Sequence, residues 1–284
     1  MARLLLGVLA CIYGGSLLAS VLHYTSAGGK ASPWLVFPLA AAAFAALGGA
    51  LALLGGPWRL EHVMGRLVGT LACLYGGITV GAFAQALAGP SKPSTGQFLI
   101  STLSFQGAAV FLVARLLREH ETGWRAAFGL DWRRGPAVWL GIIVGICFLP
   151  VGWELRNVSV NVAVRLGINP VEQQAVKLIR ETVSWAPRLA EAAAAVLLAP
   201  LGEELVFRGV LYRFVREAGY PRLALWGTSA LFAAIHVNAV AFAPLFALAL
   251  VLTVLYERTG NLLAPIIAHS IFNAVELVGL FLSS

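Results

Sequence analysis

The segment Gly202–Gly209 (GEELVFRG) places two adjacent carboxylates and an arginine inside an apolar part of the sequence. An ionisable group near the centre of a bilayer costs about 3 kcal/mol or more to insert, and it usually faces the inside of a helix bundle with a partner. On a helix, Glu204 and Arg208 stand four residues apart on one face, where they can form an ion pair. Glu203 lies about 100° further round the helix and stays available for chemistry. The segment therefore predicts a functional site at membrane depth.

Two of the five histidines, His236 and His269, fall inside apolar stretches. Asn273 follows His269 by four residues, so both side chains can point to one spot from the same helix while His236 arrives from another helix. Together with Glu203, these residues offer a base, two imidazoles that can position a water or a metal, and a neutral amide that can stabilise an oxyanion. These residues are therefore candidates for carrying chemistry in the membrane.

The composition indicates a membrane protein made of helices, because 59% of the 284 residues are hydrophobic and only 12% are charged. Apolar stretches of about 17–25 residues are long enough to span a bilayer as helices. We therefore expect an all-α fold, a polytopic transmembrane helix bundle of eight to nine spans. Two short stretches, Leu223–Val237 and Val240–Tyr256, are expected to be tilted, partly buried or re-entrant. The other apolar stretches are Leu4–Leu22, Trp34–Leu54, Leu67–Leu87, Phe98–Leu117, Pro136–Leu155, Leu189–Phe214 and Leu262–Leu282.

The placement of the basic residues predicts the orientation of the chain, because basic residues favour cytoplasmic loops. The net charge is +7, and the arginines gather after the second and fourth apolar stretches, whereas the loops after the first and third carry one lysine each. This alternation places the N-terminus in the cytoplasm, and it requires no nucleic-acid partner. The Ala-, Leu- and Arg-rich, Lys-poor composition is typical of GC-rich bacterial genomes, so we expect a multi-pass protein of a bacterial cell membrane.

The sequence also predicts a modular organisation. The segment LACIYGG at 9–15 recurs as LACLYGG at 71–77, which are 62 residues apart. We interpret residues 1–117 as a four-helix N-terminal membrane module with an internal duplication. Residues 118–135 form a basic interfacial connector, and residues 136–284 form a catalytic membrane domain. Within that domain, Asn169 and Pro170 predict the start of an amphipathic surface helix that includes Ile179 and Val183 on its apolar face.

Three motifs in this order, Glu-Glu-x-x-x-Arg at 203–208, Phe-x-x-x-His at 232–236 and His-x-x-x-Asn at 269–273, resemble the CPBP family of intramembrane proteases. This family includes the CAAX prenyl endopeptidases and bacterial Abi-type proteins, and the resemblance extends from about residue 136 to the C-terminal end. It implies that Glu203 activates the attacking water, that His236 helps to hold this water and that Asn273 stabilises the oxyanion. His269 would complete the polar site, and Glu204 and Arg208 would give structural support.

Metal binding stays open at this point. The family is commonly described as metalloproteases, and Glu203, His236 and His269 could supply the three protein ligands of a catalytic divalent metal such as zinc. The sequence has no His-Glu-x-x-His motif, however, and a water held by Glu and His can attack without an ion.

The leading hypothesis is an intramembrane endopeptidase that hydrolyses a peptide bond of a membrane-associated protein or peptide, with the lipid bilayer as its surroundings. Two alternatives belong to other classes. A proton-coupled secondary transporter would use Glu203, Glu204 and the histidines as a proton relay. A non-catalytic immunity or scaffold membrane protein would keep the motifs for packing alone.

Overall fold

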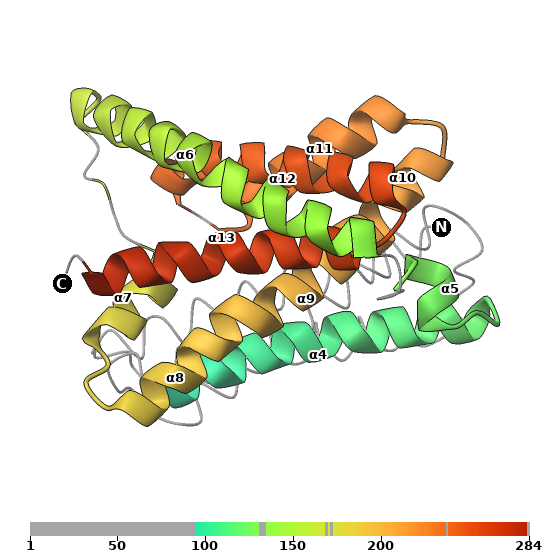
Figure 1. Ribbon diagram of the computed structural model, residues 1–284, viewed down its shortest axis with the longest axis horizontal. Helices are drawn as coiled ribbons and strands as arrows, with labels where there is room; N and C mark the ends of the chain where they lie inside the picture. Colours follow the sequence, from blue (N-terminus) through green and yellow to red (C-terminus); the bar gives the residue numbers. More distant parts are fainter. Residues whose placement is uncertain (1–94, 131–134, 168–169, 171–172, 237, 283–284) are drawn as a thin grey trace, which may run out of the picture. The chain divides into compact units, whose positions relative to one another are not determined.

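The computed structural model describes residues 95–130, 135–167, 170, 173–236 and 238–282, and all regular secondary structure in these ranges is helical (Figure 1). The all-α prediction is confirmed for this part of the chain. Three of the described helices are long and apolar enough to cross a membrane, namely Gly135–Arg165, Ala239–Thr259 and Leu263–Leu282. The total of eight to nine spans stays a prediction. The first three expected spans and the internal duplication lie outside the described residues.

The chain divides into two compact units, Met1–Leu116 and Leu117–Ser284. The described part of the first unit is helix α4 (Thr95–Glu119), which covers the expected span Phe98–Leu117 and continues into the first residues of the second unit. The proposed N-terminal module, residues 1–117, lies mostly outside the described residues and stays a prediction.

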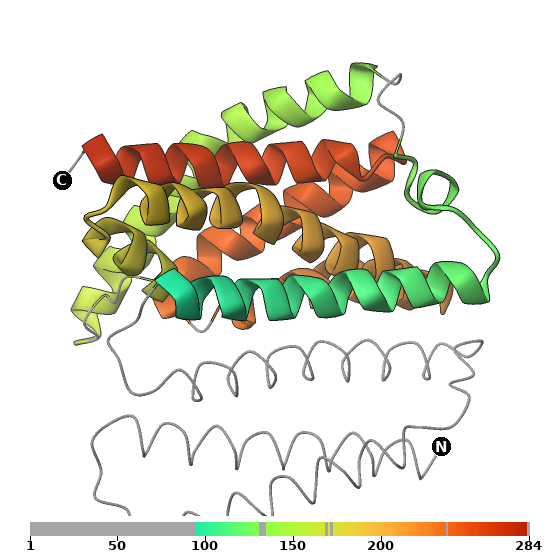
Figure 2. The same cartoon turned by 90° about the horizontal axis from the view of Figure 1, so that it is seen from below.

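The second unit contains the three motifs. A long helical run from Trp185 to Glu217 carries the two glutamates, and it changes between α-helical and π-helical geometry along its length. Helix α13 runs beside this run (Figure 2). In chain order the elements are α5 (Trp124–Phe128), α6 (Gly135–Arg165), α7 (Gln174–Glu181), α8 (Trp185–Ala193), η1 (Ala194–Leu198), α9 (Ala199–Glu204), η2 (Leu205–Tyr212), α10 (Arg213–Glu217), α11 (Pro221–Ala234), α12 (Ala239–Thr259) and α13 (Leu263–Leu282).

Helices α6, α12 and α13 form the packed centre of the second unit (Figure 1). Glycines on α6 let it approach α13 closely, as small residues do between membrane helices. A Cβ atom at Gly141 would lie 2.6 Å from the carbonyl oxygen of Ala264, and one at Gly145 would lie 2.9 Å from that of Ala268. Further along, the rings of Phe148 and Phe272 meet edge to face, with centroids 5.7 Å apart. These contacts fix α13, which carries His269 and Asn273.

The connector before α6 packs against the segment that carries the Glu-Glu motif. The side chain of Phe128 is 4% exposed and fills the space beside Gly209, where a Cβ would lie 2.8 Å from the ring. The carbonyl of Phe128 accepts from the backbone N–H of Leu262 at 3.0 Å, and the Arg213 guanidinium donates to the carbonyl of Ala127 at 2.6 Å. The connector therefore holds both η2 and the start of α13.

The amphipathic surface helix differs from its prediction. Helix α7 begins at Gln174, later than the expected start near Asn169. Ile179 is buried as expected, but Val183 is 91% exposed. The reason is that Thr182 has extended backbone and ends the helix, so Val183 no longer belongs to the helical face.

Because α6 and α13 are in close contact, replacing a glycine by alanine should lower stability where the new Cβ atom meets the other helix, and not elsewhere. Gly145→Ala should lower the stability by about 1–3 kcal/mol, because the new Cβ meets the backbone of Ala268 and the two helices must separate. Gly279→Ala on α13 is the matched control, since its Cβ would meet nothing within 4 Å. Thermal unfolding of the detergent-purified proteins measures both, and equal midpoints for the two variants would contradict this packing.

Candidate active site

The buried ion pair between Glu204 and Arg208 forms the base of the site. Arg208 Nη1 lies 2.7 Å from Glu204 Oε1, and the two side chains are 1% and 0% exposed. Arg208 also donates from Nη2 to the carbonyl of Ala249 at 2.9 Å, and its Nε lies 3.4 Å from the Thr253 hydroxyl. Its guanidinium stands over the ring of Phe232, 4.8 Å from the centroid. Pairing and hydrogen bonding of this kind offset the desolvation of buried charges.

His269 joins this pair to the second glutamate. Its Nδ1 lies 3.0 Å from Glu204 Oε1. Because the carboxylate accepts, Nδ1 carries the hydrogen, which leaves Nε2 of the neutral ring as an acceptor. Nε2 lies 3.9 Å from Glu203 Oε2, too far for a direct hydrogen bond but close enough for one water to bond to both atoms.

The two glutamates have different surroundings. The side chain of Glu203 is 15% exposed, whereas that of Glu204 is fully buried. The second oxygen of Glu204, Oε2, has no hydrogen-bond partner among the described residues. Glu204 is thus fixed through one oxygen by Arg208 and His269, and Glu203 is the carboxylate that a water or substrate can reach.

His236 lies two residues after the end of α11, and its ring orientation is set by a hydrogen bond to that helix. Its Nδ1 is 2.8 Å from the carbonyl of Phe232. A carbonyl can only accept, so Nδ1 is the donor and Nε2 is free to accept. The rings of His236 and His269 both pack against Phe232, with centroids 5.0 and 5.7 Å from it. Phe232 therefore packs against both imidazoles.

Asn273 bonds to a backbone carbonyl that the irregular helix leaves without its usual donor. In the π segment η1, the backbone N–H of Ala199 donates to the carbonyl of Ala194. In an α-helix it would donate to the carbonyl of Ala195 instead. The next residue is Pro200, which has no N–H. The amide of Asn273 donates to the carbonyl of Ala195 at 3.0 Å. Its second N–H remains for another acceptor.

The structure therefore brings Glu203, Glu204, Arg208 and His269 into one group, whereas His236 adjoins it through Phe232. Asn273 lies one turn beyond His269 on α13. The carbonyl of Ala249 and the hydroxyl of Thr253, which both contact Arg208, were not predicted from the sequence. Thr253 is a polar residue inside an otherwise apolar stretch of α12, and this feature could have identified it as a candidate site residue.

The ligand set proposed for a metal does not come together in this structure. Among the described residues, no group of three or more His, Cys, Asp or Glu side chains is arranged to hold a metal ion. The set Glu203, His236 and His269 is therefore not such a group, and zinc binding stays a prediction.

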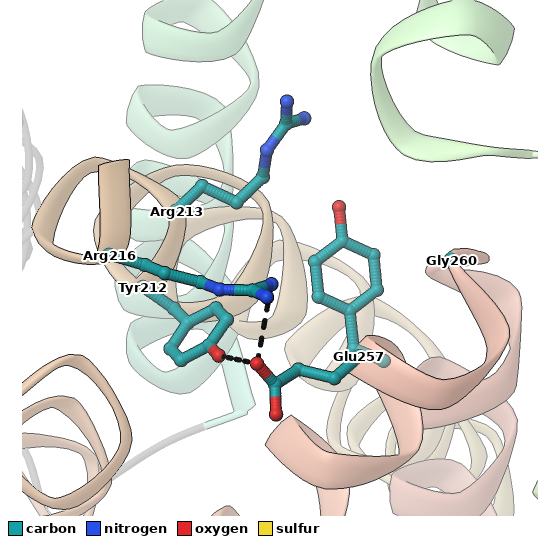
Figure 3. A pocket seen from close by; sticks show the side chains of 6 residues that line it. Tyr212, Arg213, Arg216, Glu257 and Gly260 are labelled. Atoms are coloured by element: carbon teal, nitrogen blue, oxygen red, sulfur yellow. Dashed lines mark hydrogen bonds and ion pairs between the residues drawn. The ribbon is translucent and has the colours of Figure 1, made fainter. Parts of the chain in front are cut away.

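A small cavity of about 160 Å³ lies beyond Arg208, where η2 and α10 meet the end of α12. The hydroxyl of Tyr212 donates to Glu257, and Arg216 Nη1 lies 3.3 Å from Glu257 Oε1, whereas Arg213 points away from this carboxylate (Figure 3). Glu257 is thus bonded to both Tyr212 and Arg216 within the protein. These bonds join η2 and α10 to α12.

Comparison with known proteins gives a family match over the segment that contains the candidate site. Residues 185–275 match the model of a family described as type II CAAX prenyl endopeptidase Rce1-like. The match contains all three motifs, so the predicted resemblance is confirmed over this segment. The match and the apolar helices identify the chain as an integral membrane protein.

A relative is also found in Bacillus subtilis (strain 168). The uncharacterized protein YpbD is 37% identical over 83 residues, which are 28% of this chain and 40% of YpbD. The matched region thus spans about two fifths of that relative. No solved structure gives a significant match.

The two glutamates should differ in their effect on stability. Glu204→Ala leaves Arg208 as an unpaired buried charge and should cost about 3–5 kcal/mol. Glu203→Ala should change stability less, because the Glu203 side chain is 15% exposed and approaches His269 only to 3.9 Å. Thermal unfolding of the purified proteins measures both. A loss for Glu203→Ala as large as that for Glu204→Ala would contradict the separation of roles.

Proposed function

We propose that this chain is an intramembrane endopeptidase that hydrolyses a peptide bond of a membrane-associated protein or peptide with water activated by Glu203. The observation that carries the proposal is the approach of Glu203 Oε2 to His269 Nε2 at 3.9 Å, with the imidazole fixed by Glu204. The matched family is one of endopeptidases by its description, which supports a peptide or protein substrate.

The residues suggest a sequence of steps. Glu203 removes a proton from a water that also bonds to His269 Nε2, and the water oxygen attacks the carbonyl carbon of the peptide. The second N–H of Asn273 donates to the oxyanion that forms. When the C–N bond breaks, the proton on Glu203 moves to the leaving nitrogen. Nε2 of His236 is a second acceptor for the water or substrate. Glu204 and Arg208 hold His269 and do not touch the reacting atoms.

Zinc is a separate proposal. The ligands predicted from the sequence are Glu203, His236 and His269, which do not form a metal-holding group in this structure, so they would have to approach one another for zinc to bind. A bound zinc ion would polarise the water or the peptide carbonyl. The steps above do not depend on it. The location is also part of the proposal: a bacterial cell membrane, with the N-terminus in the cytoplasm.

The experiment that tests the proposal compares the full-length protein with Glu203→Ala on a library of membrane peptides, with products identified by mass spectrometry. Glu203→Ala should reduce cleavage at least about 100-fold, as expected for loss of a general base. Glu154→Ala is the matched control, because Glu154 is an exposed acid on α6 and should leave cleavage unchanged. Equal cleavage by the wild type and Glu203→Ala would contradict the proposal. A parallel series with a chelator tests the zinc proposal.

Asn273 should affect turnover more than substrate binding. Asn273→Ala removes a donor to the oxyanion, which should lower kcat about 100- to 1,000-fold with little change in KM. It also leaves the Ala195 carbonyl without this partner, so the thermal midpoint should be measured alongside. A fully folded variant with unchanged kcat would show that Asn273 supports only the helix and takes no part in the reaction.

A further inference from the structure

Helices α6, α11 and α12 form an apolar groove on the side of α12 that faces away from the site. Its volume is about 470 Å³, within the range of about 300–1,000 Å³ that small-molecule sites occupy. Ala249 and Thr253 of α12 contact Arg208, whereas the next residues along, Leu250 and Val254, line the groove. The groove is therefore separate from the candidate active site, although both use α12.

One end of the groove is cationic. Arg258 lines the groove and stands one turn beyond Val254 on α12. Arg222 stands one turn before Trp226, another lining residue, on α11. Helices α11 and α12 follow each other through a short connection and pack together, so the start of one lies toward the end of the other. Arg222, at the start of α11, therefore lies toward the same end of the groove as Arg258, which lines it. Both residues are exposed, and among the described residues none pairs with the guanidinium of either.

This pattern restricts what can occupy the groove. An extended peptide would bring backbone N–H and C=O groups against apolar side chains, and only Arg258 could pair with them. An acyl chain has no such groups to satisfy. A phosphate at the head of that chain would neutralise the exposed arginines, as basic pockets between membrane helices do with anionic lipids.

We infer that the groove between α6, α11 and α12 binds an anionic phospholipid of the bilayer, with an acyl chain between Val144 and Trp226 and the phosphate at Arg258 and Arg222. The occupied groove would support α12 from the face opposite Arg208. This site does not depend on the proposed peptidase activity.

The test uses quenching of Trp226 by lipids brominated on the acyl chain. The full-length protein is placed in nanodiscs with brominated phosphatidylglycerol or brominated phosphatidylcholine, and the signal of Trp226→Phe is subtracted to isolate Trp226. Brominated phosphatidylglycerol should reach half-maximal quenching at a mole fraction at least about five-fold lower than brominated phosphatidylcholine. Arg222→Gln and Arg258→Gln should each reduce this preference by about five-fold, because one arginine near the surface of an anionic membrane contributes about that much to binding.

Arg125→Gln is the matched control, because Arg125 is an exposed arginine of α5 that does not line the groove, and its preference should equal that of the wild type. Equal quenching by the two lipids, or a preference that persists in both arginine variants, would overturn the inference. Such a result would mean that Trp226 makes only non-specific contact with the surrounding lipid. Absence of quenching of Trp226 by either lipid would also overturn it, and would indicate that another part of the chain or a second copy covers the groove.

Discussion

The ion pair of Glu204 and Arg208 is the constraint on which the described domain depends. Each charge is costly at membrane depth, so each must be paired and hydrogen-bonded inside the protein. Arg208 meets this need by bonding to α12 through the Ala249 carbonyl, and Glu204 bonds to α13 through His269. One pair thereby joins three helices. The hydrogen bond from His269 Nδ1 to Glu204 also sets the ring so that Nε2 faces Glu203.

The irregular geometry of the helical run from Trp185 to Glu217 serves the site. In a regular α-helix, the carbonyl of Ala195 would already accept from the backbone N–H of Ala199. The π segment η1 and Pro200 leave that carbonyl available, so α13 is tied to the run at a second point. Membrane helices tolerate such breaks where neighbouring helices satisfy the freed groups. Asn273 is therefore held one turn from His269 with a donor still free.

The sequence allowed part of this site to be predicted. The spacing of Glu204 and Arg208 indicated their ion pair, and the structure contains it. The spacing of His269 and Asn273 correctly placed them on one helix. The π segments and the carbonyl partners of Arg208 and Asn273 were not predicted, because tertiary packing decides which backbone carbonyls remain available to a side chain. The end of α7 at Thr182 was missed for a similar reason, since a local change of backbone overrode an apolar periodicity that continued to Val183.

The central claim is direct attack on the peptide carbonyl by a water held between Glu203 and His269. The most direct measurement is cleavage by the full-length protein in ¹⁸O-labelled water with hydroxylamine present, followed by mass spectrometry of the new C-terminus. The account predicts a carboxylate with one ¹⁸O atom and no hydroxamate, because no covalent acyl intermediate forms. A hydroxamate product would contradict it, since it would show that a side chain attacks the peptide before water does.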